Sequence, residues 1–309
     1  MRRAALVFLL LCSAGARAAT NDLQLFRLGS PDNITVCTIC LGADNVVVPG
    51  DPSAQFRFAR MTATLALAFA PAFEDQAQTT GQAGFEVGAG TKVAFPRLSE
   101  QEWPSQGTLG TGAPPQMLFL PTITVRKGLG GSVELGAAVS LLAGSQTVGL
   151  SGQVRWAALE GLYGLPDVAL RAWASHLIGA QELNLSFGGA DILVSKSFGV
   201  AGSVRLQPYA QYGITLVDAS TGAIDFNPGA EDPANPSADD RSFHRIAFWE
   251  NRYHRFAAGV RMVAGSVLFG LEGGMAFGTN PVQHDGSSGT ISTQFTRVWT
   301  ASARLGLAF

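Results

Sequence analysis

Apolar and polar residues alternate with a period of two through most of the chain after Gly84. In the last twelve residues, 298–309, one face carries Trp299, Leu307 and Phe309, whereas the opposite face carries Ser302 and Arg304. Successive side chains of a strand point to opposite faces, so such a strand separates two different environments. The pattern predicts antiparallel strands with one apolar and one polar face.

Ten segments show this alternation, at about 84–95, 116–127, 133–141, 147–156, 168–175, 183–194, 203–215, 252–263, 266–278 and 298–309. The connections between these segments are numbered in chain order. Three of the five odd-numbered connections are long, and all the even-numbered ones are short. An even strand number and this sorting of the loops are typical of bacterial membrane barrels. We therefore predict an all-β fold, an antiparallel transmembrane β-barrel of about ten strands, over residues 84–309. In 183–194 the apolar phase changes at Gly188-Gly189, which predicts a β-bulge.

The first 18 residues have the features of a secretory signal peptide. Arg2 and Arg3 precede a short apolar run, and Ala16-Arg17-Ala18 is a small-x-small cleavage site. Cleavage there would remove three arginines and change the formal charge from −2 to −5. This charge argues against a nucleic-acid partner. The rest of the chain has no run of about 18 apolar residues, so no transmembrane helix is expected.

Residues 19–83 precede the predicted barrel and form a segment that we expect in the periplasm or the lumen. Its first part, to about residue 52, has the composition of coil. Ser53 is placed to cap a helix over 54–70, which Pro71 ends. The helix either docks in or under the lumen or packs on periplasmic loops. Cys37 and Cys40, in the order C-T-I-C, are expected to form a local disulfide in an oxidising compartment.

The aromatic end of segment 298–309 resembles the closing strand of Gram-negative outer-membrane β-barrels. That resemblance implies an outer-membrane location, with outer-membrane lipids and the barrel assembly machinery as partners, and Phe309 as the assembly signal. The motifs K-G-L-G-G, E-G-L-Y-G-L-P and S-K-S-F-G-V, at 127–131, 160–166 and 195–200, resemble periplasmic turns of a proteobacterial family. Members of that family are barrels with an N-terminal helical or plug segment. A more distant resemblance is to long-chain fatty-acid transporters, which also place an N-terminal segment inside the barrel.

The inward face of the predicted strands carries most of their charge. Its acidic residues are Glu86, Glu134, Asp191 and Glu272. Five of its basic residues lie toward the periplasmic strand ends and define a predicted basic belt, Arg126, Arg155, Arg205, Arg261 and Arg304; Lys92, Arg171 and Arg255 lie elsewhere on that face. A ten-stranded barrel is narrow and unpaired buried charge is costly, so ion pairs are expected. The belt is also placed to bind the last carbonyls of helix 54–70, or Glu74 and Asp75, which makes 54–75 a predicted plug.

The sequence gives little indication of catalysis. Ser151 lacks the G-x-S-x-G context of a nucleophile elbow. Asp239, Asp240, His244 and the His284-Asp285 pair do not reproduce the paired motifs of the omptin proteases. We predict no enzyme, no cofactor and no metal site, and a solvated acidic loop at 219–251. Two functions stay open: a narrow or plugged channel or transporter for a small solute, and a non-conducting structural or surface-interaction barrel that acts through its long extracellular loops.

Overall fold

The computed structural model describes residues 20–37, 45–72, 76–105, 107–108, 113–162, 164–200, 202, 204–229, 235–279 and 297–309, and the backbone alone at Cys37 and Asn45. The predicted signal peptide lies outside these residues. The same holds for Cys40 and for the side chain of Cys37, so the disulfide stays a prediction.

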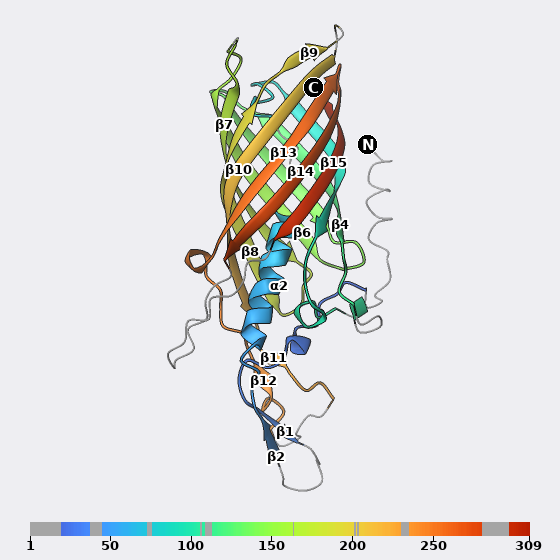
Figure 1. Cartoon of the computed structure of the whole chain (residues 1–309), viewed down its shortest axis with the longest axis vertical. Helices are drawn as coiled ribbons and strands as arrows, with labels where there is room; N and C mark the ends of the chain where they lie inside the picture. The colour runs from blue at the N-terminus through green and yellow to red at the C-terminus, as the bar shows by residue number, and fades with distance from the viewer. Residues whose placement is uncertain are drawn as a thin grey trace.

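Ten antiparallel strands form a closed barrel, as the alternation predicts (Figure 1). The last strand pairs with the first, from Trp299 opposite Phe95 to Ala308 opposite Glu86. The strands are β3 (Phe85–Phe95), β4 (Leu118–Gly128), β5 (Val133–Leu141), β6 (Val148–Leu159), β7 (Asp167–Ile178), β8 (Leu183–Ser195), β10 (Val204–Thr221), β13 (Arg252–Ala264), β14 (Val267–Thr279) and β15 (Val298–Ala308). A short strand, β9 (Phe198–Val200), pairs with the start of β10.

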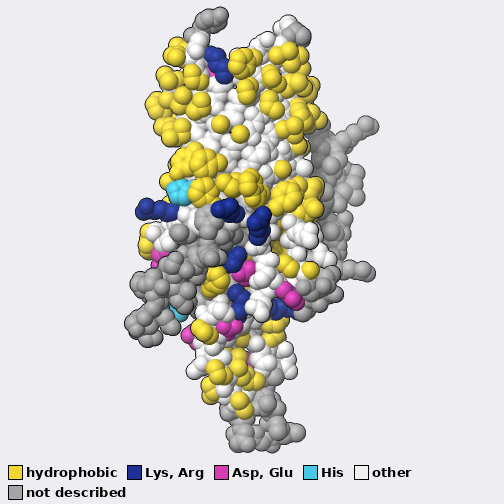
Figure 2. All heavy atoms as spheres, in the orientation of Figure 1, with side chains coloured by type: hydrophobic (Ala, Val, Ile, Leu, Met, Phe, Trp, Pro, Cys, Tyr) yellow, Lys and Arg dark blue, Asp and Glu magenta, His cyan; other side chains and the backbone are white. Residues whose placement is uncertain are grey.

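The outer face of the barrel is apolar. Outward side chains such as Ile123, Val154 and Leu305 are 51, 49 and 61% exposed. Figure 2 shows hydrophobic side chains spread over the barrel wall, with Lys and Arg side chains gathered beyond one edge of this band. A closed barrel with an apolar outer band satisfies every backbone hydrogen bond within lipid, because it has no free strand edge. Among the described residues, no helix has the length and apolar character needed to cross a membrane.

The predicted bulge at Gly188-Gly189 is wrong. β8 keeps one register through both glycines, with Trp173 opposite Gly189 and Ala174 opposite Gly188. Odd-numbered residues of β8 point inward along its whole length, including Leu185 and Phe187, which are fully buried. The apolar phase changes because the inner face itself is apolar at one end of the barrel.

Residues 20–72 fold outside the strand pattern. They form a 3-10 turn, η1 (Leu25–Leu28), a hairpin of β1 (Ile34–Cys37) and β2 (Asn45–Val48), and the helix α2 (Ala54–Phe69). The helix lies where the sequence predicts it. The hairpin was missed, because its two strands are short and stand among Gly, Pro, Asp and Asn residues.

The N-terminal segment lies at the end of the barrel that carries the long connections, which we call the loop end (Figure 1). Phe309 lies at the opposite end with the short connections, the turn end. The backbone N–H of Asn21 donates to Gly144 O at 2.7 Å, and Leu23 forms a β-bridge with Ser105. Both partners belong to connections at the loop end. Four more short elements lie there: η2 (Glu100–Glu102), β11 (Ile224–Asp225), β12 (Asp240–Arg241) and η3 (Phe248–Glu250).

Residues 76–84 connect α2 with the first barrel strand at the turn end. Gln78 Nε2 donates to Asp167 Oδ2 at 3.0 Å, and the backbones of Phe85 and Phe309 exchange two hydrogen bonds. The chain therefore enters the lumen from the loop end and leaves it at the turn end. The sequence left a periplasmic and a luminal position open and placed the helix against a basic belt at the periplasmic end, whereas α2 enters from the loop end (Figure 1).

Candidate functional site

The lumen at the turn end is organised around Glu86 on β3, which is 1% exposed. Its carboxylate accepts hydrogen bonds from Arg126 on β4 and Arg304 on β15, and from Arg261 Nη2 at 2.5 Å on β13. One buried carboxylate thus bridges three guanidiniums from three other strands. Their positions follow from the barrel register, in which Glu86 stands directly opposite Arg126.

A second buried carboxylate, Glu134 on β5, links this cluster to the N-terminal segment. Glu134 accepts from Arg155 Nη2 at 2.6 Å and lies 3.6 Å from Arg126 Nη1. Its other oxygen accepts the backbone N–H of Thr80 at 2.9 Å. Arg155 Nη1 donates to Gln76 O at 2.5 Å. Luminal charge therefore holds residues 76–80 inside the barrel.

Asp191 on β8 forms the third cluster. It accepts from Arg171 Nη2 at 2.7 Å and from Arg255 Nη2 at 2.9 Å. The Arg255 guanidinium lies 4.8 Å from the centre of the Trp173 ring and also donates to Pro71 O at 3.1 Å. This cluster stands directly beyond the C-terminal end of α2.

The fourth predicted luminal acid, Glu272 on β14, lies within electrostatic reach of Arg171 and Arg255 of the Asp191 cluster. It is buried and accepts from the hydroxyl of Tyr209 at 3.0 Å. All four acids that the sequence placed on the inner face therefore lie in the lumen, and Glu86, Glu134 and Asp191 form salt bridges with arginines.

The helix α2 fills the loop-end half of the lumen. Every residue from Met61 to Ala70 is buried, although most are apolar and the predicted lumen was polar. The inner face of the strands is apolar at this level, so both surfaces are removed from water. The inward residues in the same core are Ala94, Leu118, Leu120, Leu142, Trp173, Leu177, Leu183, Leu185, Phe187, Val217, Tyr253, Ala276 and Val298.

Long-range contacts fix the N-terminal half of α2 to the connection between β10 and β13. The ring of Phe58 stacks on that of Phe243, with centroids 4.6 Å apart. The side chain of Gln55 accepts the N–H of His244 at 3.0 Å and donates to its carbonyl at 2.8 Å. The loop therefore packs on the helix as part of one folded unit.

The C-terminal end of α2 meets Lys92 of β3. Lys92 Nζ donates to Ala70 O at 2.6 Å and to Leu67 O at 3.3 Å. The last carbonyls of a helix are the negative end of its dipole, so a buried ammonium stabilises them. Sequence reasoning assigned this role to the basic belt. The structure gives it to Lys92, because the helix enters from the loop end, and Lys92 lies nearer that end than the belt does.

Replacing Lys92 by methionine is expected to loosen the last turn of α2. The change removes two hydrogen bonds to buried carbonyls at a cost of about 1–3 kcal/mol. Hydrogen exchange at the amides of Leu67 to Ala70 should become faster in the folded protein. Lys196→Met is the matched control, because Lys196 donates to Leu165 O at the turn end. Unchanged exchange in Lys92→Met would contradict the capping role.

The five arginines of the predicted belt do not all meet. Arg126, Arg155, Arg261 and Arg304 lie together in the buried clusters. Arg205 has the inward register but is exposed, because it lies at the turn-end tip of β10, opposite Gly199 of β9. Glu74 and Asp75 lie outside the described residues.

The region between the helix and the clusters contains a small cavity. This cavity, lined by the C-terminal end of α2, Lys92, Thr122 and Arg304, has room for about one water molecule. In this conformation the described part of the lumen is filled by side chains and by the N-terminal segment.

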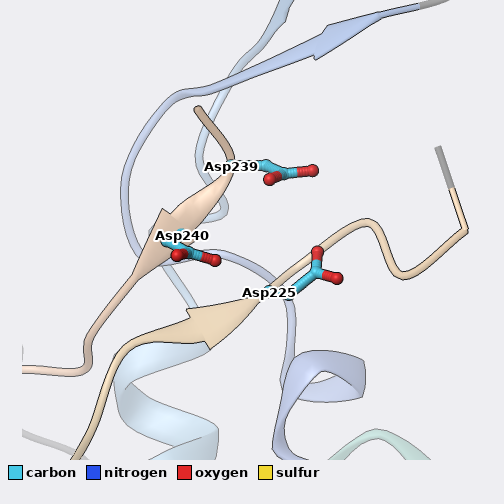
Figure 3. Close-up of side chains that lie close together, drawn as sticks. All are labelled: Asp225, Asp239 and Asp240. Carbon is cyan, nitrogen blue, oxygen red and sulfur yellow. The ribbon is translucent and has the colours of Figure 1, made fainter. Parts of the chain in front are cut away.

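Three aspartates of the predicted acidic loop, 219–251, meet at the loop end. Asp225 of β11 and Asp240 of β12 lie beside Asp239, with carboxylate oxygens within 4.8 Å of one another (Figure 3). Burial, together with the neighbouring carboxylates, raises the pKa of Asp239 above its ordinary value. Pairing of β11 with β12 brings Asp225 opposite Asp240, 15 positions later in the sequence, so no local motif marks the cluster.

The closed barrel, its apolar outer face and its charged lumen define a transmembrane β-barrel of the outer-membrane type. The chain matches no family model. It also matches no curated protein.

Three solved structures similar to the chain are distant from it in sequence. The N-terminal β-barrel domain of OprF from Pseudomonas aeruginosa is 12% identical, with 74% of this chain and 99% of that one covered and a TM-score of 0.30. The Neisserial surface protein NspA is 15% identical over 74% and 100% of the two chains, with a TM-score of 0.30. The outer-membrane protease OmpT of Escherichia coli is 10% identical over 73% and 95%, with a TM-score of 0.36.

Proposed function

We propose that this protein is a closed, non-catalytic outer-membrane barrel that holds its N-terminal segment outside the membrane and acts through the surface this segment builds with the long loops. The observation that carries the proposal is the filled lumen. Helix α2 occupies the loop-end half, and the clusters around Glu86, Glu134 and Asp191 occupy the turn-end half. Of the two functions that the sequence leaves open, a filled lumen favours the non-conducting one.

The orientation of the barrel supports an external position for residues 20–53. Short connections face the periplasm in outer-membrane barrels and long ones face outward. In this chain the short connections share the turn end with Phe309, and residues 20–53 lie at the other end (Figure 1). The N-terminal segment would then be the outermost part of the protein.

The proposed surface is a folded cap and not a set of separate loops. Arg57 Nε on α2 donates to Leu28 O at 2.9 Å, and Arg241 Nη2 of β12 donates to Asn33 O at 2.8 Å. Asp22 accepts from both the hydroxyl and the next backbone N–H of the Ser145-Gln146 turn, at 3.0 and 2.9 Å. Such connections hold a recognition surface in one shape, which lowers the entropic cost of binding.

Conductance across a planar bilayer tests this proposal. The wild-type protein is expected to stay at background, because both halves of the lumen are filled. Steady openings of the wild-type barrel would overturn the proposal and favour the channel.

A variant that lacks residues 54–72 separates the two functions further. It empties the loop-end half but leaves the arginine clusters at the turn end, so conductance should still stay at background. Openings that appear only in this variant would identify α2 as the plug of a channel. Trp249→Ala is the control, since Trp249 is 77% exposed outside the lumen and should change neither result. Heat-modifiable migration in detergent gels shows that each barrel has folded.

A further inference from the structure

Three arginines lie at the loop end of the barrel, on the outward side of β3, β15 and β13. Arg97 follows β3, Arg297 precedes β15, and Arg252 begins β13. All three side chains are exposed. Each has the parity of the lipid-facing residues on its strand, since Phe95, Trp299 and Phe256 are outward and 40, 47 and 45% exposed.

The register of the barrel makes these arginines neighbours. Trp299 stands opposite Phe95 in the pairing of β15 with β3, and Arg297 and Arg97 each lie two residues further along. Arg252 stands opposite Thr279 of β14, the strand between β13 and β15. Since adjacent strands are about 4.8 Å apart, the three positions span about 15 Å of the barrel rim. We call them the arginine row.

The arginine row borders a belt of aromatic side chains. Phe95, Trp299, Phe256 and Tyr212 are outward at this end, and aromatic residues of this kind mark the level where hydrocarbon meets headgroups. Figure 2 shows Lys and Arg side chains side by side just beyond the apolar band on this face. The positive charges therefore stand at the level of the lipid headgroups.

Two lysines at the turn end donate to nearby backbone carbonyls. Lys127 Nζ donates to Ala83 O at 3.0 Å, and Lys196 Nζ donates to Leu165 O at 2.5 Å. These lysines stabilise their own turns.

We infer that the arginine row binds the phosphate groups of an anionic lipid in the leaflet at the loop end. Guanidinium groups bind phosphate oxygens through paired, charge-assisted hydrogen bonds. A lipid fits better than a soluble anion, because the row continues directly from the lipid-covered band, so acyl chains pack on the aromatic belt while phosphate meets the arginines. The membrane itself is thus a specific partner on one side of the barrel.

The test compares diphosphoryl lipid A with its dephosphorylated form on the full-length protein in detergent, by native mass spectrometry. Wild-type protein should bind the phosphorylated form about 100-fold more tightly, because each arginine near an anionic lipid contributes about fivefold. The triple variant R97Q/R252Q/R297Q should lose this preference. R97K/R252K/R297K should keep most of it, since the charge remains. The control K127Q/K196Q, at the turn end, should leave it unchanged.

Two results would overturn the inference. One is equal binding of the two lipid forms by the wild-type protein, a comparison that holds even if the glutamine variant does not fold. The other is an unchanged preference in a folded R97Q/R252Q/R297Q variant. Inorganic phosphate at millimolar concentration should not displace the lipid; displacement would identify a site for free anions and would also overturn the inference.

Discussion

Replacing Glu86 by glutamine is expected to destabilise the barrel by about 3–5 kcal/mol. Glutamine keeps the size of the side chain but removes the buried negative charge that three arginines share. Arg126, Arg261 and Arg304 would then keep their charges at a site where ions are costly without a carboxylate. The measurement is the free energy of unfolding in urea, with the protein in lipid vesicles.

The matched control for Glu86→Gln is Arg205→Gln. Arg205 has the same inward register as the clustered arginines but is exposed at the turn-end rim, so its loss should change the free energy of unfolding by less than about 0.5 kcal/mol. Equal effects of the two substitutions would show that the buried cluster contributes no more than a surface charge.

Replacing Phe58 by alanine is expected to weaken the docking of the N-terminal segment by about 3–5 kcal/mol, the usual cost of removing a buried phenyl ring. Phe58 is fully buried and stacks on Phe243 of the β10–β13 connection. The strands do not depend on this contact, so the barrel should persist. Limited proteolysis in detergent should cleave residues 20–72 faster while heat-modifiable migration stays normal.

Phe56→Ala is the control for Phe58→Ala, since it changes the same residue type two positions earlier in the same helix. Phe56 is only partly buried and lies under the Arg60 guanidinium at 5.6 Å, so its loss should cost about 1 kcal/mol or less. If cleavage is equally fast in both variants, the Phe58–Phe243 contact does not hold the segment.

The strands of the barrel were predictable because the two faces meet different surroundings. Residues such as Leu305 and Arg304 alternate on β15 because one face meets lipid and the other meets the lumen. The same period places Glu86, Arg126 and Asp191 on the inner face. Their individual partners were not predictable, since Glu86 and Arg261 come together only when β15 closes onto β3.

The predictions failed where another part of the chain fills the lumen. Leu183, Leu185 and Phe187 point inward because α2 packs on them, whereas the sequence suggested a change of phase and a bulge. Lys92 caps the helix because the helix enters from the loop end. Strand periodicity describes the wall of the barrel. It does not indicate the direction in which a separate segment passes through the lumen.

Cysteine labelling on intact cells tests most directly the claim that the N-terminal segment lies outside the membrane and occupies the lumen from that side. In a background with serine at positions 37 and 40, cysteine is introduced at Val47 of β2, which is 58% exposed at the loop end, or at Gly130 of the turn before β5. A membrane-impermeant maleimide should label Val47→Cys in intact cells and Gly130→Cys only after the outer membrane is permeabilised. The reverse pattern, with Val47→Cys protected and Gly130→Cys labelled, would contradict the account.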